Sequence, residues 1–229
     1  MEAVVVDDVR FEPNMERLVK RLRVRQGSSQ ETEFARLVVE AAEIAKPKAQ
    51  YGVAYVDERS DDTVVVDGVT LTSRVLRVNL DQVYRVFPHV ATCGTELDEW
   101  ASTLDDLLHR FWSEGIRESA LSAASQALYS HMVETHSLGK TSTMAPGSLG
   151  DWPLREQRQL FTILGDTEAT IGVRLTESSL MLPTKSVSGV RFPTETRFES
   201  CQLCPRDACP GRRAPYEADL YDRRYRQRE

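Results

Sequence analysis

Residues 145–198 read APGSLGDWPLREQRQLFTILGDTEATIGVRLTESSLMLPTKSVSGVRFPTETRF. The segment opens on a glycine-proline loop, and the residues that follow predict a helix over 154–163. Two further stretches, 171–175 and 186–192, are predicted to be strands. A segment that mixes loop, helix and strand in this way is typical of an α+β domain.

The residues before this segment predict more elements of both kinds. Apolar runs, together with the hairpin signal Asp67-Gly68, predict strands over 3–6, 51–56, 63–66, 69–71 and 88–92. Helical spacing predicts helices that begin after Asn14, cover 31–45 and 80–85, and extend from Glu96 to His136, with Gly115 as a kink or a break. We therefore expect an α+β fold, a single compact domain with a mixed or antiparallel sheet and long helices.

The composition limits the classes of function. The 229 residues are 41% hydrophobic and 28% charged, and no apolar run approaches the length of a membrane span. The formal net charge of -6 argues against a nucleic-acid partner, because nucleic-acid binders carry a basic excess. The first residues, MEAVVVDDVRF, have none of the three parts of a signal peptide, so we expect a cytoplasmic protein.

Short motifs occur in a fixed order through the segment. They are Ala145-Pro146-Gly147, Asp151-Trp152-Pro153-Leu154, Ile171-Gly172-Val173, Leu175-Thr176-Glu177-Ser178 and Ser186-Val187-Ser188-Gly189. In this order they resemble the reactivation domain of cobalamin-dependent methionine synthase. The first 140 residues are similar only in outline, through Ala91-Thr92-Cys93-Gly94 before a long helix.

The resemblance implies a function and a set of partners. The family's reactivation domain binds S-adenosylmethionine, docks over the corrinoid of a methyltransferase, and lets an electron and a methyl group restore methylcobalamin. A free-standing chain of this kind implies a corrinoid protein or cobalamin-dependent methyltransferase as partner, with the corrinoid on that partner. It also implies an electron donor such as a ferredoxin or flavodoxin. Whether the chain is itself an enzyme stays open.

Six residues are candidates for cofactor binding. An Ala-Pro-Gly turn leaves backbone amides and carbonyls open to a ligand, and Glu177 offers a carboxylate at a strand end. Ser186 and Ser188 alternate along a strand and so share one face. The alternative is that these groups only make turn and strand-end hydrogen bonds. The candidates are Ala145, Pro146, Gly147, Glu177, Ser186 and Ser188.

Two positions depart from the family's S-adenosylmethionine motif, which reads Arg-x-Ala/Ser-Pro-Gly-Tyr. Thr143 stands at the arginine position and Ser148 at the tyrosine position. Threonine cannot make the bidentate contact that an arginine makes with the ligand's carboxylate, and serine provides no aromatic wall. The segment therefore predicts the reactivation fold more strongly than it predicts the usual ligand.

Three cysteines lie just beyond the segment, at Cys201, Cys204 and Cys209, in the spacing C-x2-C-x4-C followed by proline. In a cytosolic chain such a cluster indicates metal or redox chemistry rather than disulfides. We expect a 4Fe–4S cluster, with zinc as the alternative, because iron–sulfur clusters reach the low potential that reduction of cobalt(II) requires. Cys93 is the candidate fourth ligand, and its alternative role is that of a small buried hydrophobic residue.

These observations divide the chain into an activation-like domain, 1–198, and a cysteine-containing extension, 199–229, packed on it. Our leading hypothesis is reductive activation of a corrinoid protein, with the electron passing through the cysteine cluster. One alternative is a non-enzymatic corrinoid-protein binding or assembly module with structural zinc, and another is an S-adenosylmethionine-dependent reactivation subunit. The extension is also rich in arginine, which indicates either a solvated tail or a docking surface for an acidic partner: Arg212, Arg213, Arg223, Arg224, Arg226 and Arg228.

Overall fold

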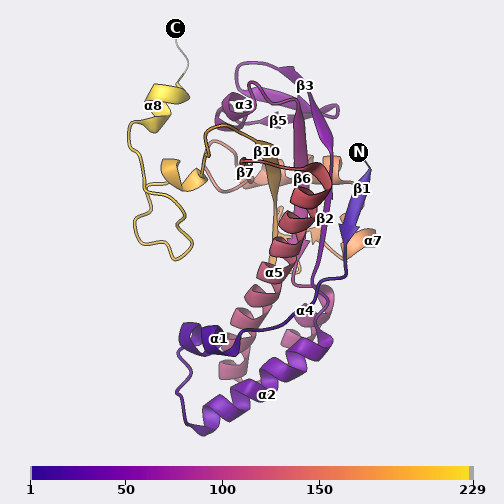
Figure 1. Ribbon diagram of the computed structural model, residues 1–229, viewed down its shortest axis with the longest axis vertical. Coiled ribbons are helices and arrows are strands. Elements are labelled where there is room, and N and C mark those ends of the chain that lie inside the picture. Colours follow the sequence, from indigo (N-terminus) through magenta and orange to yellow (C-terminus); the bar gives the residue numbers. More distant parts are fainter. Residues whose placement is uncertain (1, 227–229) are drawn as a thin grey trace.

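The centre of the protein is an antiparallel sheet, described here from a computed structural model that covers residues 2–226 (Figure 1). Its strands follow the order β1-β2-β6-β3-β4-β5, while β10 pairs with the other edge of β6 and β7 pairs with β10. The strands of this sheet are β1 (Ala3–Val6), β2 (Lys48–Gly52), β3 (Ala54–Arg59), β4 (Thr63–Val66), β5 (Val69–Thr72), β6 (Arg85–Thr92), β7 (Thr141–Met144) and β10 (Ser186–Pro193). The strands β8 (Arg174–Leu175) and β9 (Met181–Leu182) form a separate pair.

The helices surround this sheet and extend the molecule at one end. The longest is α5 (Leu107–His136), whose 30 residues correspond to about 45 Å at the usual helical rise. It lies along the sheet and continues to a helical end formed with α1, α2 and α4, which gives the molecule a curved outline (Figure 1). The other helices are α1 (Met15–Leu22), α2 (Ser29–Ile44), α3 (Arg74–Asn79), α4 (Thr95–Ser102), α6 (Gln157–Leu164), α7 (Thr167–Ile171) and α8 (Leu220–Arg224).

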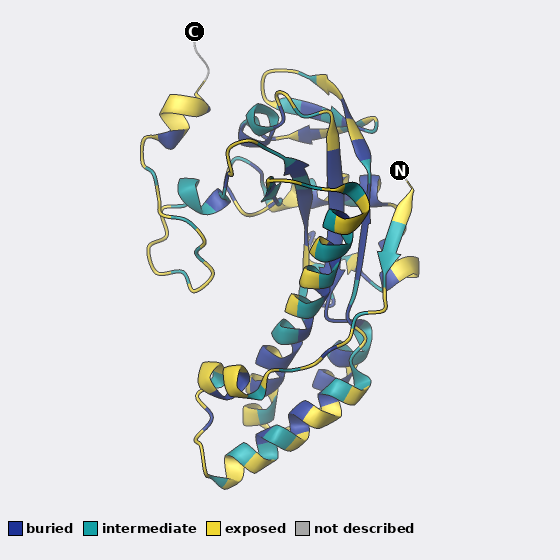
Figure 2. Ribbon diagram, in the orientation of Figure 1, coloured by how far each residue is buried: buried dark blue, intermediate teal, exposed yellow. Residues whose placement is uncertain are grey.

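Three groups of buried apolar side chains hold these elements together (Figure 2). One lies on the sheet face that α3 and α6 cover. A second lies on the opposite face, where Ala124, Leu128 and Met132 of α5 pack on β2 and β6. The third joins α1, α2, α4 and the first half of α5, and it includes Trp112, whose ring meets Phe34 edge-on at 5.3 Å.

The α+β fold with an antiparallel sheet and long helices is confirmed, but several element boundaries were predicted wrongly. The predicted helix over 80–85 is a turn, since the helix forms earlier, at α3, where the Ser73 hydroxyl accepts from the Leu76 amide at 3.0 Å. The predicted strand 51–56 is two strands that are interrupted at Val53. The predicted strand 171–175 contains the end of α7 and only two residues of strand.

The break in the predicted helical region 96–136 lies before Gly115. The chain leaves α4 at Ser102 and begins α5 at Leu107, because the Asp106 carboxylate caps the new helix by accepting from the Leu108 and His109 amides. Gly115 lies inside α5, where a Cβ would come within 2.7 Å of a Leu22 methyl carbon. Glycine at this position therefore allows α1 to pack closely on α5 without bending the helix.

The C-terminal extension is tied to the body at both of its ends. Phe198 is buried and its amide donates to the Ser142 hydroxyl at 2.7 Å. Tyr225, which follows α8, is fully buried, and its carbonyl accepts from Arg74 Nε at 3.0 Å. Between these anchors the extension contains a short 3-10 helix, η2 (Ser200–Leu203). None of the helices within residues 2–226 has the length and apolar character that a bilayer span requires.

Candidate functional site

The strand β7 and the turn that follows it form the centre of the candidate site. Thr143 on β7 is paired with Arg191 on β10, so the two side chains emerge on the same face of the sheet. The Ala145-Pro146-Gly147 turn follows directly, and the Gly147 amide donates to the Trp152 carbonyl at 2.7 Å. Gly147 has a φ of +81°, a conformation that favours glycine. The chain therefore needs this turn for its own shape.

A small cavity of about 290 Å³ lies against this turn. It brings together four of the six predicted cofactor residues: Ala145, Pro146, Ser186 and Ser188. Leu154, Leu180 and Met181 supply an apolar part of its wall. Ligand pockets in proteins usually span about 300–1,000 Å³, so this cavity is at the lower limit for a cofactor.

The predicted polar groups of this cavity already have partners within the protein. The Ser186 hydroxyl donates to the Pro183 carbonyl at 2.7 Å, and the Ser188 hydroxyl donates to Gln157 Oε1 at 3.3 Å. Glu177 lies apart from the cavity in an exposed turn, where its carbonyl accepts from Arg158. The structure therefore gathers the turn and the two serines but does not bring Glu177 to them.

The Asp151-Trp152 motif has a structural role. One Asp151 carboxylate oxygen accepts from the Ser73 hydroxyl and from the Val75 amide, which fixes the start of α3. Trp152 is fully buried in the core beside α6. These two motif residues therefore build the fold rather than contact a ligand.

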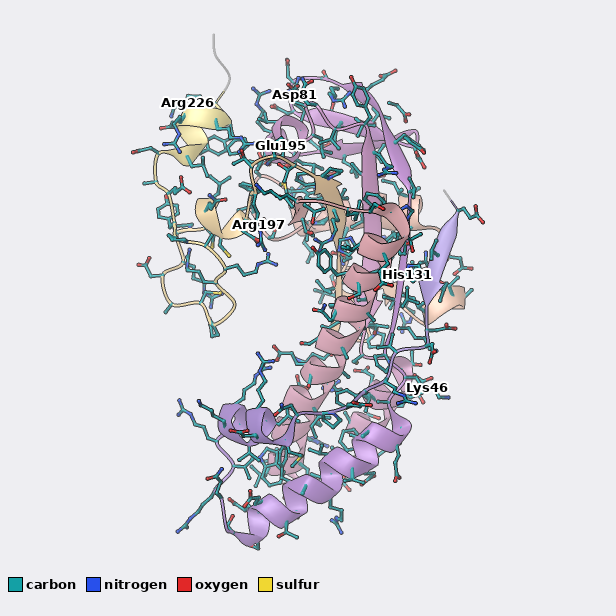
Figure 3. The ribbon with its side chains drawn as sticks, in the orientation of Figure 1. Lys46, Asp81, His131, Glu195, Arg197 and Arg226 are labelled. Atoms are coloured by element: carbon teal, nitrogen blue, oxygen red, sulfur yellow. The ribbon has the colours of Figure 1, made fainter. Side chains whose placement is uncertain are left out.

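A much larger groove, of about 1270 Å³, opens on the α5 face of the sheet. Its walls are α5, the β7–β10 edge with the residues that follow β10, and Gly211 and Arg213 of the C-terminal extension. Val187 borders both this groove and the small cavity. Glu195 and Arg197 lie where the chain passes from β10 into the extension (Figure 3). Four cationic side chains line the groove: Lys140, Arg191, Arg197 and Arg213.

Arg191 is the most buried of the four cationic side chains that line the groove. Its guanidinium carbon lies 4.6 Å from the centre of the Tyr129 ring, and one terminal nitrogen donates to the Thr141 hydroxyl at 2.8 Å. Its Nε is buried without a hydrogen-bond partner, and so is the hydroxyl of Thr143. Burial is the main cause that lowers the pKa of Arg191 below its usual value.

One half-buried carboxylate holds two of the arginines that line the groove. Glu199, whose side chain is 12% exposed, pairs with Arg197 at 2.9 Å and with Arg213 at 3.1 Å. Glu118 on the opposite wall pairs with Arg21 at 2.5 Å. The groove is lined by four cationic side chains and two carboxylates, Glu118 and Glu195, so cationic groups outnumber carboxylates in its lining. The groove is therefore suited to an anionic group.

The cysteine loop has a defined shape that depends on Arg212. This guanidinium donates to the carbonyls of Cys201 at 3.1 Å, Cys204 at 3.0 Å and Ala214 at 3.0 Å, and also to that of Arg206. The Arg213 amide donates to Cys201 Sγ at 3.4 Å, and this hydrogen bond is the main cause that lowers the pKa of the Cys201 thiol. The loop therefore favours the thiolate form at Cys201.

The four cysteines are free thiols in the structure, and they do not share one environment. Cys201, Cys204 and Cys209 are half-buried in the extension, whereas Cys93 is fully buried in the core that α2, α4 and α5 form. Burial raises the pKa of Cys93 to about 12, which keeps it protonated. Within residues 2–226, the side chains of His, Cys, Asp and Glu form no group of three or more that is placed to hold a metal ion.

The arginines of the extension mostly have partners inside the protein. Arg223 pairs with Glu217 at 3.2 Å and Arg226 with Asp222 at 2.8 Å, while Arg224 donates to Asn79 Oδ1 at 3.0 Å. Together with Arg212 in the loop and Arg213 on Glu199, five of the six arginines that were predicted as a solvated tail or docking surface have a described contact. Arg228 lies outside the described residues. Their first contribution is therefore to hold the extension in place.

Sequence reasoning missed Arg191 and Tyr129 as site residues. Arg191 follows the Ser-Val-Ser-Gly motif directly, but its importance comes from being paired with Thr143 across two strands that lie far apart in the sequence. Tyr129 belongs to a helix whose register on the sheet the sequence does not reveal. The available signal was the alternation along 186–192, which places Arg191 on the face opposite to Ser188.

Comparison with known proteins identifies one segment and the fold. Residues 141–208 match the family model of the vitamin B12-dependent methionine synthase activation domain. The structure of the MetH reactivation domain bound to AdoHcy is similar to this chain, with a TM-score of 0.58 and 16% sequence identity. The similarity covers 87% of this chain and 81% of that one. Among curated proteins, no match was found.

Proposed function

We propose that this chain, which has the fold of the methionine synthase reactivation domain and carries the segment that matches its family model, reactivates a corrinoid-dependent methyltransferase. The match over residues 141–208 is the observation that carries the proposal, because it includes β7, the Ala145-Pro146-Gly147 turn and β10. The similarity to a reactivation domain bound to AdoHcy, over 87% of the chain, supports it.

The reaction that fits this proposal has two steps. An electron from a ferredoxin- or flavodoxin-type donor reduces cobalt(II) of the partner's corrinoid to cobalt(I). The cobalt(I) then takes the methyl group of S-adenosylmethionine as a cation, which leaves methylcobalt(III) and S-adenosylhomocysteine. The chain's part is to bind the methyl donor in the region of the two cavities that Val187 borders, and to hold it over the corrinoid.

The test is a reconstitution with a cobalamin-dependent methyltransferase inactivated as cobalt(II). We expect the cobalt(II) absorbance to be replaced by that of methylcobalamin only when the chain, S-adenosylmethionine and a reduced flavodoxin-type donor are all present. Omission of each component in turn is the control. Persistence of cobalt(II) with all components present would contradict the proposal.

The cysteine loop favours a second part of the proposal, in which the chain itself binds a metal centre that relays the electron. We propose that Cys201, Cys204 and Cys209 bind an iron–sulfur cluster, with zinc as the structural alternative in a non-enzymatic binding or assembly module. The lowered pKa of Cys201 and the Arg212 contacts that fold the loop support this, because thiolates are the ligands of both metals. A fourth ligand from Cys93 would require it to leave the helical core.

Metal analysis of the anaerobically purified chain tests this part of the proposal. We expect iron and acid-labile sulfide in the wild type and their loss in the Cys201→Ser, Cys204→Ser and Cys209→Ser variants. The Cys93→Ala variant is the matched control, and it should retain the iron because Cys93 is buried away from the loop. A colourless chain with stoichiometric zinc would favour the structural alternative, and a chain without metal would remove both.

A further inference from the structure

We propose that the groove on the α5 face is an oxyanion-binding subsite in which Arg191 makes the central contact. The ligand that it fits carries a carboxylate or a phosphodiester. This inference deepens the proposed function, on which it rests for the choice of ligands. It assigns the subsite to residues that lie outside the Ala-Pro-Gly turn and on the other face of the sheet from Ser188.

The first argument is the pair of unsatisfied polar atoms on the groove side of β7 and β10. Arg191 Nε and the Thr143 hydroxyl are both buried without a hydrogen-bond partner, and the two residues are directly paired between the strands. A buried polar atom without a partner costs free energy and calls for an explanation. Trp152 Nε1 and Arg117 Nε are also without a partner, but neither residue lines the groove, whereas Arg191 does, so its guanidinium can donate to an oxyanion there.

The second argument is that contacts within the protein already fix the orientation of the Arg191 side chain. Its guanidinium stacks on Tyr129 and donates to Thr141, so two contacts fix its orientation while Nε stays free. Gly189 lets β7 lie close to β10 beside this pair, since a Cβ there would meet the Met144 carbonyl oxygen at 2.7 Å and Thr143 Cγ2 at 3.3 Å. An arginine that is already oriented loses little conformational freedom when it binds an anion.

The third argument is the charge of the surrounding groove. Lys140, Arg197 and Arg213 line it together with Arg191, and Glu199 is shared between two of these arginines. Thr143 stands where the family motif has arginine, so the paired position on β10 supplies a guanidinium at the same place along the sheet. The groove can thus hold an anion although β7 itself offers only a hydroxyl.

Two matched pairs of ligands test the subsite by calorimetry at neutral pH. S-adenosylhomocysteine is compared with 5′-methylthioadenosine, which lacks the amino-acid part with its carboxylate and ammonium groups, and cobalamin is compared with cobinamide, which lacks the nucleotide phosphodiester. We expect at least one anionic ligand to bind the wild type and to bind Arg191→Gln about 10- to 100-fold more weakly, as for loss of a charge-assisted hydrogen bond. The ligand pair that shows this loss identifies the source of the oxyanion.

Three variants separate binding from folding and from bulk charge. Arg191→Lys should recover part of the affinity, and Thr143→Val should weaken binding less than Arg191→Gln does. Arg174→Gln removes an exposed cation elsewhere, 3.8 Å from Glu168, and should bind like the wild type. Equal affinity of the wild type and a folded Arg191→Gln variant, or no binding of any anionic ligand, would overturn the inference.

The reactivation assay distinguishes the two proposals. Binding that depends on Arg191 without any recovery of methylcobalamin would contradict the proposed function and leave the subsite standing. Full reactivation by Arg191→Gln, with unchanged affinity for both anionic ligands, would contradict the subsite and leave the function standing.

Discussion

Replacement of Gly94 by alanine is expected to lower the free energy of unfolding by about 4 kcal/mol, from backbone strain and overpacking together. Gly94 joins β6 to α4 with a φ of +94° and a ψ of 150°, a conformation that side-chain-bearing residues rarely adopt. A Cβ there would collide with the carbonyl group of Lys46, whose carbon lies 3.0 Å away. Because this neighbour is backbone, it cannot rotate aside.

Urea unfolding at 25 °C, followed by circular dichroism, measures this effect against a matched control. Gly68→Ala also introduces a side chain at positive φ, +75°, but its Cβ would meet nothing within 4 Å. We expect the control to lose only about 1 kcal/mol, the cost of the left-handed conformation. Equal losses in the two variants would show that the contact with Lys46 has no energetic role.

A second large effect is expected when the pH is lowered, through His89. This side chain is 5% exposed on β6, and burial lowers its pKa from 6.5 to about 4, with the Arg191 charge adding to the shift. Its Nδ1 donates to the Phe87 carbonyl at 3.1 Å, a bond that raises the pKa but does not offset burial. The folded state therefore holds His89 neutral.

The sign of the pH effect follows from these two pKa values. Between about pH 6.5 and pH 4 the unfolded chain binds a proton that the folded chain refuses, so stability falls as the pH falls. From pH 7 to 4.5 we expect His89 to account for about 2–3 kcal/mol of lost stability. The His89→Gln variant, which keeps a donor for Phe87, should lose that much less over the same range.

Carboxylates also contribute to the loss of stability at low pH, and the comparison of wild type with His89→Gln cancels their contribution. A hydrogen bond from the His109 amide is the main cause that lowers the pKa of Asp106. Burial raises the pKa of Glu114, but Lys185 and Arg117 together outweigh burial and lower it below its usual value. Both carboxylates therefore contribute stability that is lost at low pH, in the wild type and in His89→Gln alike. Parallel stability curves for the wild type and His89→Gln between pH 7 and 4.5 would contradict the assignment to His89.

The sequence was sufficient to predict the fold class, because its strongest signals for secondary structure are local. The Asp67-Gly68 turn fixes the β4–β5 hairpin, and apolar spacing identifies α2 and most of α5. The errors arose where capping decides the boundary. Ser73 begins α3 and Asp106 begins α5, and both positions depend on hydrogen bonds that apolar spacing does not reveal.

The site was predictable only where it is continuous in sequence. The Ala-Pro-Gly turn and the alternating serines could be found, since each is a short run. The groove could not, because Tyr129, Arg191 and Arg213 come from three separate elements whose meeting depends on sheet register and on the path of the extension. For Cys93 the sequence left two roles open, a metal ligand or a small buried hydrophobic residue, and its burial in the helical core depends on packing that the sequence alone does not show.

Arg212 makes the path of the cysteine loop tolerant of changes in its side chains. Its hydrogen bonds end on main-chain carbonyls, which every amino acid possesses, so the loop's path does not depend on which side chains stand at most of its positions. Such a loop can exchange surface residues, and with them its preferred partner, without being refolded. Within this loop, positions other than the three cysteines and Arg212 can therefore be exchanged without changing the path of the chain.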